Sequence, residues 1–194
     1  MTDETRASQS PRTPGQALTA ISLVGFMGAG KTTVGRALAG KLGWDFLDLD
    51  DLIQARDGRT IPEIFRNSGE SAFRDMERQL LREFVNTSQA KASVLSLGGG
   101  AFIDNTNQQL LRENEIPAVF LDASAEELFR RCQQPGVDRP LLSDPNGFSA
   151  LYERRRPAYL NAAICIQTAG REIAPIVDEI ITRLELGENL GASR

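Results

Sequence analysis

The chain has 194 residues, enough for one domain of ordinary size with a sizeable core. Hydrophobic residues make up 41% and charged residues 25% of it, which is ordinary for a globular protein in water. The net charge is −4, and no apolar run approaches the roughly 18 residues that span a bilayer. We therefore expect no nucleic-acid partner and no membrane partner.

The chain contains no histidine, which limits the kinds of catalytic and metal sites that it can form. This absence excludes a histidine triad and histidine-bound zinc, so any general base is expected to be a carboxylate. The two cysteines, Cys132 and Cys165, show no pairing pattern, which suits a reducing compartment. The N-terminus carries Asp3 and Glu4 and no apolar core, so it resembles neither a signal nor a typical transit peptide. We expect a cytoplasmic protein.

The first ordered stretch contains the most informative motif. Residues 1–16 are polar and predict a disordered tail, whereas residues 20–24 predict a buried strand and residues 34–42 a helix. Between these two elements, residues 25–33 read Gly-Phe-Met-Gly-Ala-Gly-Lys-Thr-Thr and fit G-x-x-x-x-G-K-[ST] at every fixed position. In this strand–loop–helix setting the loop can turn its backbone N–H groups onto phosphate oxygens. The Lys31 ammonium would reach the β- and γ-phosphates, and the Thr32 hydroxyl would bind Mg²⁺.

Three aspartates follow the second predicted strand, residues 45–48. Asp48, Asp50 and Asp51 lie at its carboxyl end, where open parallel sheets form their ligand crevice. The alternative is that Asp50 or Asp51 only caps a helix that starts near Leu52. Three aspartates within four positions favour a role in the crevice for at least one of them.

Two helices and a glycine run come next. Residues 61–65 and 70–84 predict helices with a break at Gly69, and Arg74 and Glu77 lie beside the apolar stripe of the second. By themselves these two charges are best interpreted as surface neighbours on a solvated face. Residues 93–97 predict a third strand, which ends in Gly98-Gly99-Gly100. This run permits either close approach of a ligand or a flexible turn.

The remaining elements continue the alternation of strands and helices. We predict helices at 105–114, 125–132, 149–156 and 173–186, strands at 118–122 and 163–167, a Pro- and Gly-rich lid at 133–148 and a loose tail at 187–194. The alternation predicts a parallel α/β sheet of five strands in one domain, residues 17–186.

The combined motifs resemble the shikimate kinases. The phosphate-loop motif is followed, in the family's order and spacing, by these stretches: Asp48-Leu49-Asp50, Phe73-Arg74-Asp75-Met76-Glu77, Gly98-Gly99-Gly100, Arg139-Pro140-Leu141-Leu142 and Arg155-Arg156-Pro157-Ala158-Tyr159. The resemblance covers about residues 21–184. The phosphate loop alone is unspecific, whereas the whole set is highly specific.

The resemblance implies a P-loop, nucleoside-monophosphate-kinase-like three-layer sandwich. It would have a five-stranded parallel sheet, a helical substrate-binding region at about 49–84 and a lid. The implied activity is ATP-dependent phosphorylation of the 3-hydroxyl of shikimate, which gives shikimate 3-phosphate and ADP on the way to chorismate and the aromatic amino acids. Mg²⁺ would accompany ATP, and we expect a monomer.

The same resemblance implies the roles of individual residues. ATP would be bound by Gly28, Ala29, Gly30, Lys31, Thr32, Thr33, Arg131 and Arg139. Shikimate would be bound by Asp50, Arg74, Gly98, Gly99, Gly100 and Arg155. The metal ligands would be Thr32 and Asp48, and the catalytic residues Lys31, Asp50 and Arg139. The segment after Arg131 is one residue longer than the family pattern.

Two alternatives stay open at this point. The first is a gluconate kinase of similar fold, which would not need Asp50, Arg74 and Arg155 together. The second is a binding protein that has lost catalysis, which would not need every active-site side chain. A GTPase would need an Asn-Lys-x-Asp-like motif, which Lys41 and Lys91 do not have beside them. Asp50 can act as a general base or can only orient the attacking hydroxyl.

Overall fold

Five parallel strands form the centre of the structure, a computed structural model that describes residues 18–88, 90–133 and 144–186. The strand order is β2-β3-β1-β4-β5. The strands are β1 Ala20–Val24, β2 Asp45–Asp48, β3 Ser93–Ser96, β4 Ala118–Asp122 and β5 Ile164–Gln167. The two expected tails, most of the expected lid and Arg139 lie outside the described residues.

The central strands are mostly apolar because helices cover both faces of the sheet. All residues of β1, β3 and β4 are buried, as expected for strands inside a parallel sheet. β1 pairs with β3 on one side and with β4 on the other. This central position places the end of β1, where the phosphate loop begins, in the middle of the sheet's carboxyl edge.

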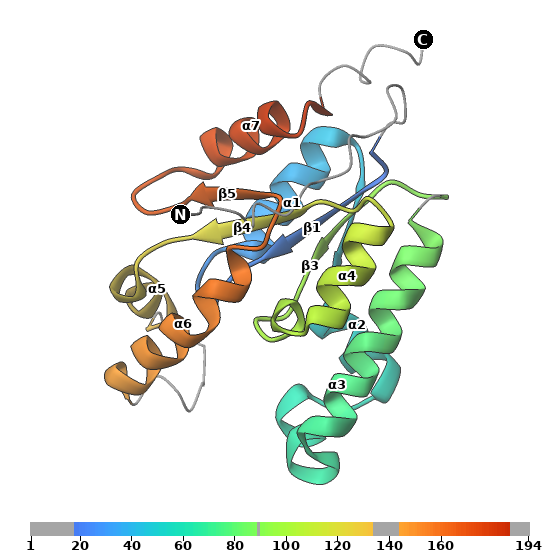
Figure 1. The fold of residues 1–194 in the computed structure, drawn as a ribbon, viewed down its shortest axis with the longest axis vertical. Helices are drawn as coiled ribbons and strands as arrows, with labels where there is room; N and C mark the ends of the chain where they lie inside the picture. Colours follow the sequence, from blue (N-terminus) through green and yellow to red (C-terminus); the bar gives the residue numbers. More distant parts are fainter. Residues whose placement is uncertain (1–17, 89, 134–143, 187–194) are drawn as a thin grey trace, which may run out of the picture.

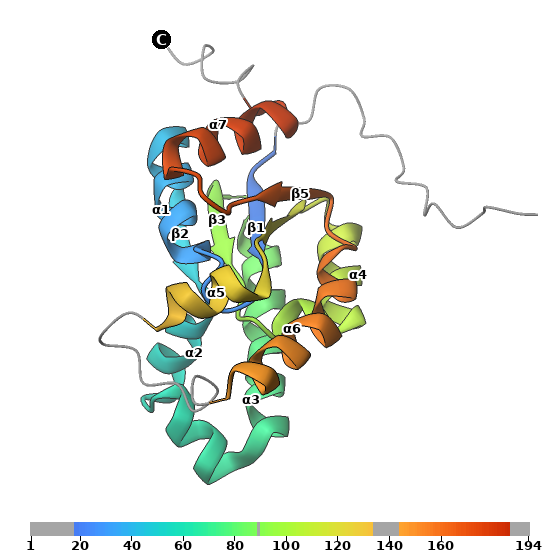
Figure 2. The same cartoon turned by 90° about the vertical axis from the view of Figure 1, so that its left-hand side faces the viewer.

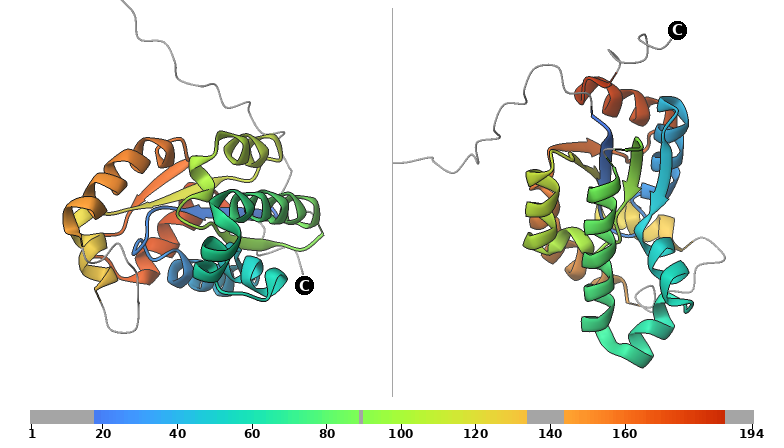
Figure 3. Two further views of the ribbon diagram at one scale, coloured as in Figure 1. Left: turned by 90° about the horizontal axis from the view of Figure 1, so that it is seen from below. Right: turned by 90° about the vertical axis from the view of Figure 1, so that its right-hand side faces the viewer.

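The helices form two layers around the sheet. The helices α1 (Lys31–Leu42) and α7 (Ile173–Arg183) lie on one face, and α4 (Asn105–Glu113) lies on the other (Figure 2). The helices α2 (Leu49–Asp57) and α3 (Ile61–Thr87) extend away from the sheet (Figure 1). The remaining helices are α5 (Ala125–Cys132) and α6 (Pro145–Tyr159), and a short 3-10 turn, η1, covers Ala101–Ile103. The prediction of a three-layer α/β fold with a five-stranded parallel sheet is confirmed (Figure 3).

Several helix boundaries differ from the sequence prediction, and those of α6 and α1 bear on the site. α6 starts at Pro145, inside the stretch predicted as lid, because proline suits the first turn of a helix, where its missing N–H has no partner to lose. It then continues beyond Arg156, across Pro157, to Tyr159. α1 starts at Lys31 instead of residue 34, which brings Lys31 and Thr32 into its first turn. The predicted break at Gly69 is confirmed, since its φ of 80° and ψ of 173° interrupt α3.

None of the helices in the described part of the chain is both long enough and apolar enough to cross a membrane.

Gly35 lets α1 pack closely on the sheet. A Cβ atom at this position would lie 2.4 Å from Cε2 of Phe46 on β2 and 3.1 Å from Cδ1 of Leu23 on β1. Real Cβ atoms essentially never lie as close to a neighbour as 2.4 Å, so a larger residue at position 35 would force Phe46 or α1 to shift.

We predict opposite effects for two glycine substitutions in α1. Gly35→Ala should destabilise the fold by about 1–3 kcal/mol, because the new methyl group overpacks the interface with Phe46. Gly40→Ala should stabilise it by about 0.5–1 kcal/mol, since Gly40 is exposed, nothing lies within 4 Å of its Cβ position, and alanine is the better helix former. Urea unfolding of both variants measures the difference. Equal changes would show that α1 does not depend on close packing at Gly35.

Candidate active site

The phosphate-loop motif connects β1 to the first turn of α1. Gly30 is the N-cap of α1 and has a left-handed φ of 89°. The Lys31 ammonium donates to the carbonyl oxygens of Gly25, at 3.0 Å, and Phe26, at 3.1 Å, so the lysine folds back along its own loop. The N-terminus of α1 and this ammonium together form a positively charged site suited to phosphate.

Asp48 links the phosphate loop to the next helix. Its Oδ2 accepts a hydrogen bond from the Thr32 hydroxyl at 3.0 Å, and its Oδ1 accepts one from the Asp50 N–H at 3.1 Å. The second bond makes Asp48 the N-cap of α2. The alternative that Asp50 or Asp51 caps this helix is therefore wrong, because α2 starts at Leu49, three residues earlier than expected. Asp51 is exposed.

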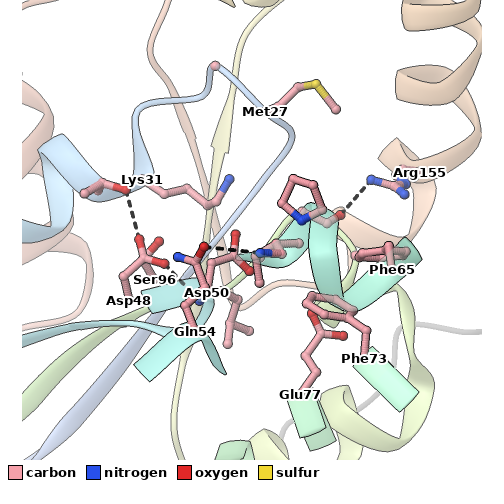
Figure 4. Close-up of a pocket in the computed structure, with 18 of the residues that line it drawn as sticks. Met27, Lys31, Asp48, Asp50, Gln54, Phe65, Phe73, Glu77, Ser96 and Arg155 are labelled. Atoms are coloured by element: carbon pink, nitrogen blue, oxygen red, sulfur yellow. Dashed lines mark hydrogen bonds between the residues drawn. The ribbon is translucent and has the colours of Figure 1, made fainter. Parts of the chain in front are cut away.

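A cavity of about 840 Å³ opens beside the phosphate loop (Figure 4). Its walls come from the phosphate loop, the end of β2, α3, the glycine run after β3, and α6. Twelve of the residues predicted for the site line it: Gly28, Gly30, Lys31, Thr32, Thr33, Asp48, Asp50, Arg74, Gly98, Gly99, Gly100 and Arg155. Residues from 28 to 155 are thus brought to one space at the carboxyl edge of the sheet.

A second cavity of about 590 Å³ lies on the other side of the phosphate loop. It shares Gly28, Gly30 and Thr33 with the first cavity and adds Ala29 and Arg131, the two other predicted ATP-binding residues in the described chain.

Arg131 is held in a fixed orientation in this second cavity. Its Nε donates to Glu127 at 2.8 Å, while Nη1 and Nη2 donate to the hydroxyl and carbonyl oxygens of Thr168 at 3.1 and 2.8 Å. A guanidinium group bound along its edges in this way keeps its planar faces available for stacking.

Charged side chains lie close to the glycine run after β3. A Cβ at Gly98 would lie 2.7 Å from Oδ1 of Asp50, and one at Gly100 would lie 2.5 Å from both terminal nitrogens of Arg74. The Gly99 carbonyl accepts a hydrogen bond from Nη1 of Arg155 at 3.2 Å. These contacts bring Asp50, Arg74 and Arg155 to the glycine run; close approach of a ligand to this backbone stays a prediction.

Arg74 forms an ion pair with a buried Glu77, which corrects the interpretation of the two as neighbours on a solvated face. Nη1 of Arg74 donates to Oε2 of Glu77 at 2.8 Å, and the Glu77 side chain is only 1% exposed. Nη2 of Arg74 also donates to Glu70, whose side chain is 68% exposed. Glu77 therefore holds the guanidinium of Arg74 at the cavity wall. The other carboxylate oxygen of Glu77, Oε1, is buried without a hydrogen-bond partner in the described chain.

Sequence reasoning overlooked Glu77, although a signal for its burial was present. The buried residues of α3 include Phe73, Leu80, Leu81 and Phe84, and position 77 lies four residues after the first of them. A glutamate in the middle of an apolar stripe is unusual, since buried charges need partners. The helical periodicity of this apolar stripe, applied strictly, would have predicted that Glu77 is buried next to an arginine three positions earlier.

An aromatic wall was also missed. Phe65 and Phe73 line the first cavity, with ring centroids 4.7 Å apart, and the guanidinium carbon of Arg74 lies 5.1 Å from the Phe73 ring centroid. Phe65 is 37% exposed, so part of an apolar ring faces the cavity opening. Such a surface suits the carbon ring of a small ligand.

Most of the chain is similar to the shikimate kinases. The family model for shikimate kinase matches residues 27–185. A shikimate kinase from Persephonella marina is 41% identical over 165 residues, which are 84% of this chain and 98% of that protein. One from Thermus thermophilus is 43% identical over 169 residues, with coverage of 86% and 90%. A solved structure of a shikimate kinase from Acinetobacter baumannii in complex with shikimate superposes with a TM-score of 0.77 at 34% identity, and the match covers 89% of this chain and 96% of that one.

The burial of Glu77 predicts a pH-dependent stability difference. Burial raises the pKa of Glu77 above its usual value of 4.5, and nearby Asp50 and Asp104 add to this, although Arg74 acts in the opposite direction. The native state therefore binds the proton more tightly than the unfolded chain, so ionisation of Glu77 lowers stability as the pH rises through this range. Glutamine at position 77 does not ionise, so the Glu77→Gln variant does not lose stability in this way. Its Tm, relative to wild type, should increase between about pH 4.5 and about pH 7.

Glu70→Gln is the matched control, because Glu70 pairs with the same arginine but is exposed and solvated in both states. It should show a smaller trend over the same range. A constant Tm difference for Glu77→Gln would contradict the raised pKa.

Proposed function

The chain belongs to the shikimate kinase family, and from that premise we propose which residues carry out the transfer of phosphate. It is an ATP-dependent kinase that phosphorylates the 3-hydroxyl of shikimate, giving shikimate 3-phosphate and ADP. The reaction is a step toward chorismate and the aromatic amino acids. We assign each substrate to one of the two cavities and give each side chain a task in the reaction.

The nucleotide is assigned to the phosphate loop and the smaller cavity. The loop residues Gly28 to Thr33 would surround the phosphates, with Lys31 moving from its own loop carbonyls to the β- and γ-phosphates. The base would lie in the 590 Å³ cavity, where Arg131 offers a planar face. This assignment puts the γ-phosphate at the residues that line both cavities.

Shikimate is assigned to the larger cavity. The observation that carries this proposal is the position of Arg74 and Arg155, which reach the same space from two different helices, α3 and α6. Shikimate carries one carboxylate and three hydroxyls, and two guanidinium groups can hold a carboxylate through charge-assisted hydrogen bonds. The glycine run would let the ligand lie close to the backbone, and Phe65 and Phe73 would contact its ring.

The metal ligands proposed are Thr32 and Asp48. Their oxygen atoms already lie 3.0 Å apart, and Mg²⁺ prefers oxygen ligands, often one carboxylate together with the phosphates of its substrate. When bound with ATP, Mg²⁺ would neutralise charge on the β- and γ-phosphates. Thr32 and Asp48 would hold this charge in the larger cavity, next to the phosphate loop.

Asp50 is the proposed partner of the attacking hydroxyl. The 3-hydroxyl oxygen forms a bond to the γ-phosphorus while the bond to the β–γ bridging oxygen breaks, and the hydroxyl proton passes to a base or to solvent. Asp50 lines the cavity two residues from Asp48, so it can accept that proton or orient the hydroxyl. Because the transition state of phosphoryl transfer is loose, positioning and positive charge contribute more than the base.

Arg139 is proposed to supply a further positive charge to the phosphates. It lies outside the described residues, so this role rests on the Arg139-Pro140-Leu141-Leu142 motif and on the family. The surrounding segment, residues 133–148, is proposed as a lid up to the start of α6 at Pro145.

Asp50→Asn tests the chemistry directly. It keeps the shape of the side chain and removes its charge, so turnover should fall while ATP binding stays intact. A fall in kcat of about 10²–10⁴ would identify Asp50 as a general base, and a smaller fall would identify it as an orienting group.

A coupled ADP-release assay with shikimate, quinate and gluconate in parallel measures turnover and substrate choice. Wild-type kcat in the variant would remove Asp50 from the active site, and faster turnover of gluconate by wild type would overturn the substrate assignment.

Arg74→Lys tests the binding of the shikimate carboxylate. Lysine keeps the positive charge but cannot form two parallel hydrogen bonds, so the Kd for shikimate should rise roughly tenfold with little change for ATP. Arg78→Lys is the control on the same helix, because Arg78 pairs with Asp75 and Asp104 instead of lining the cavity. Calorimetric titration measures both ligands. A loss of ATP affinity with unchanged shikimate affinity would reassign Arg74 to the nucleotide.

A further inference from the structure

A buried carboxylate lies behind the active site and takes no part in the proposed mechanism. Asp122 ends β4 and is 3% exposed. Its Oδ1 accepts a hydrogen bond from the Tyr152 hydroxyl at 2.7 Å, and its Oδ2 accepts from Nη2 of Arg156 at 2.8 Å and from Gln167 at 3.1 Å. A buried charge persists only when it is paired and hydrogen-bonded, and Asp122 meets both conditions.

Two of the three donors to Asp122 come from α6, one helical turn apart. Nε of Arg156 also donates to the Tyr152 hydroxyl at 3.0 Å, so Tyr152, Arg156 and Asp122 form a closed triangle of hydrogen bonds. Hydrogen bonds depend on direction as well as distance. A helix bound to a fixed point on the sheet through two residues on one face cannot rotate about its axis without breaking them.

The rotation of α6 determines where Arg155 points. Neighbouring residues on a helix project about 100° apart, so Arg155 and Arg156 face different sides of α6. Arg156 reaches back to Asp122 on β4, while Arg155 reaches the carbonyl oxygen of Gly99 at the cavity. If Arg156 is fixed, the backbone of Arg155 is fixed too.

The other contacts of α6 are mostly apolar, except that the Tyr159 hydroxyl donates a hydrogen bond to the carbonyl oxygen of Gly99. Phe148 and Tyr152 pack on Phe26 of the phosphate loop, with ring centroids 5.0 and 5.6 Å apart, and Phe26 is fully buried. Apolar packing of this kind holds α6 against the domain, but it depends mainly on buried area. The hydrogen bonds to Asp122 fix the rotation of α6 on the side facing β4, as the bond from Tyr159 does on the side facing Gly99. Binding groups must be held within roughly 10–20° of their productive geometry.

We propose that Asp122 and Arg156 are positioning residues that orient α6 and thereby hold Arg155 against the carboxylate of shikimate. The inference rests on the proposed function, which gives Arg155 its role. It adds that the affinity for shikimate depends on an ion pair that does not touch shikimate.

Arg154 and Arg156 provide a matched pair for the test, because they flank Arg155 and carry the same charge. Arg154 is exposed, whereas Arg156 is bound to Asp122. Arg156→Gln should raise the Kd and KM for shikimate about tenfold, with the KM for ATP changed less than about twofold. Arg154→Gln removes the same charge next to Arg155 and should leave both substrates near wild type. Equal effects of the two variants would mean that only the lost charge matters and would overturn the proposal.

A double variant distinguishes a loss of shikimate affinity caused by misfolding from one caused by the loss of the ion pair. Arg156→Gln alone leaves a buried carboxylate without its cation, which can destabilise the fold, whereas Asp122→Asn with Arg156→Gln removes both charges. Melting temperatures are recorded for all variants. The double variant should fold and still lose shikimate affinity; wild-type affinity, or failure of both variants to fold, would show that the ion pair serves stability alone.

Arg155→Gln separates the inference from the function on which it rests. If this variant keeps its affinity for shikimate, the proposed role of Arg155 is wrong. If it loses affinity and Arg156→Gln does not, only the positioning role of Arg156 is wrong.

Discussion

The carboxylate of Asp48 is the contact on which the geometry of the site depends. One oxygen accepts a hydrogen bond from the hydroxyl of Thr32, in the first turn of α1. The other accepts a hydrogen bond from the N–H of Asp50, at the start of α2. The first helix carries the phosphate loop and the second begins the wall of the larger cavity. A rigid, planar group with two acceptor atoms thus sets the distance between the part of the site that suits phosphate and the part that suits the acceptor. The family's reaction requires those two parts to meet within bonding distance.

Most of the fold could be predicted because its signals are local. The glycine-rich loop, the apolar strands and the aspartates after β2 are each contained within a few residues, and the parallel sheet follows from their alternation with helices. The start of α6 could not be predicted in the same way. Pro145 and Gly147 indicate a loop when they are counted by composition, yet a proline in the first turn and a glycine two residues later are compatible with a helix.

The parts of the site that escaped prediction depend on contacts between distant elements. Nothing near Asp122 in the sequence indicates that Arg156, 34 positions later, will supply its countercharge. In the same way, Thr168 becomes a partner of Arg131 only after α5 and the end of β5 come together, whereas Glu127 is a local partner four positions earlier in α5. Glu77 is different, because the periodicity of α3 could have indicated its burial, yet the sequence analysis interpreted it as a surface residue. Sequence patterns identified the residues proposed to touch the substrates better than the residues that hold them in place.

The shared wall between the two cavities has a consequence for inhibitor chemistry. Gly28, Gly30 and Thr33 line both spaces, so a ligand in one cavity and a ligand in the other would contact the same stretch of the described chain. A bisubstrate compound that joins a cyclic carboxylate to an adenosine group through a short anionic linker could follow the phosphate loop from one cavity into the next. Its second half would bind as an intramolecular partner at a high effective concentration, so its affinity would exceed that of either half alone. Selectivity would then depend on matching the linker to the length of this loop.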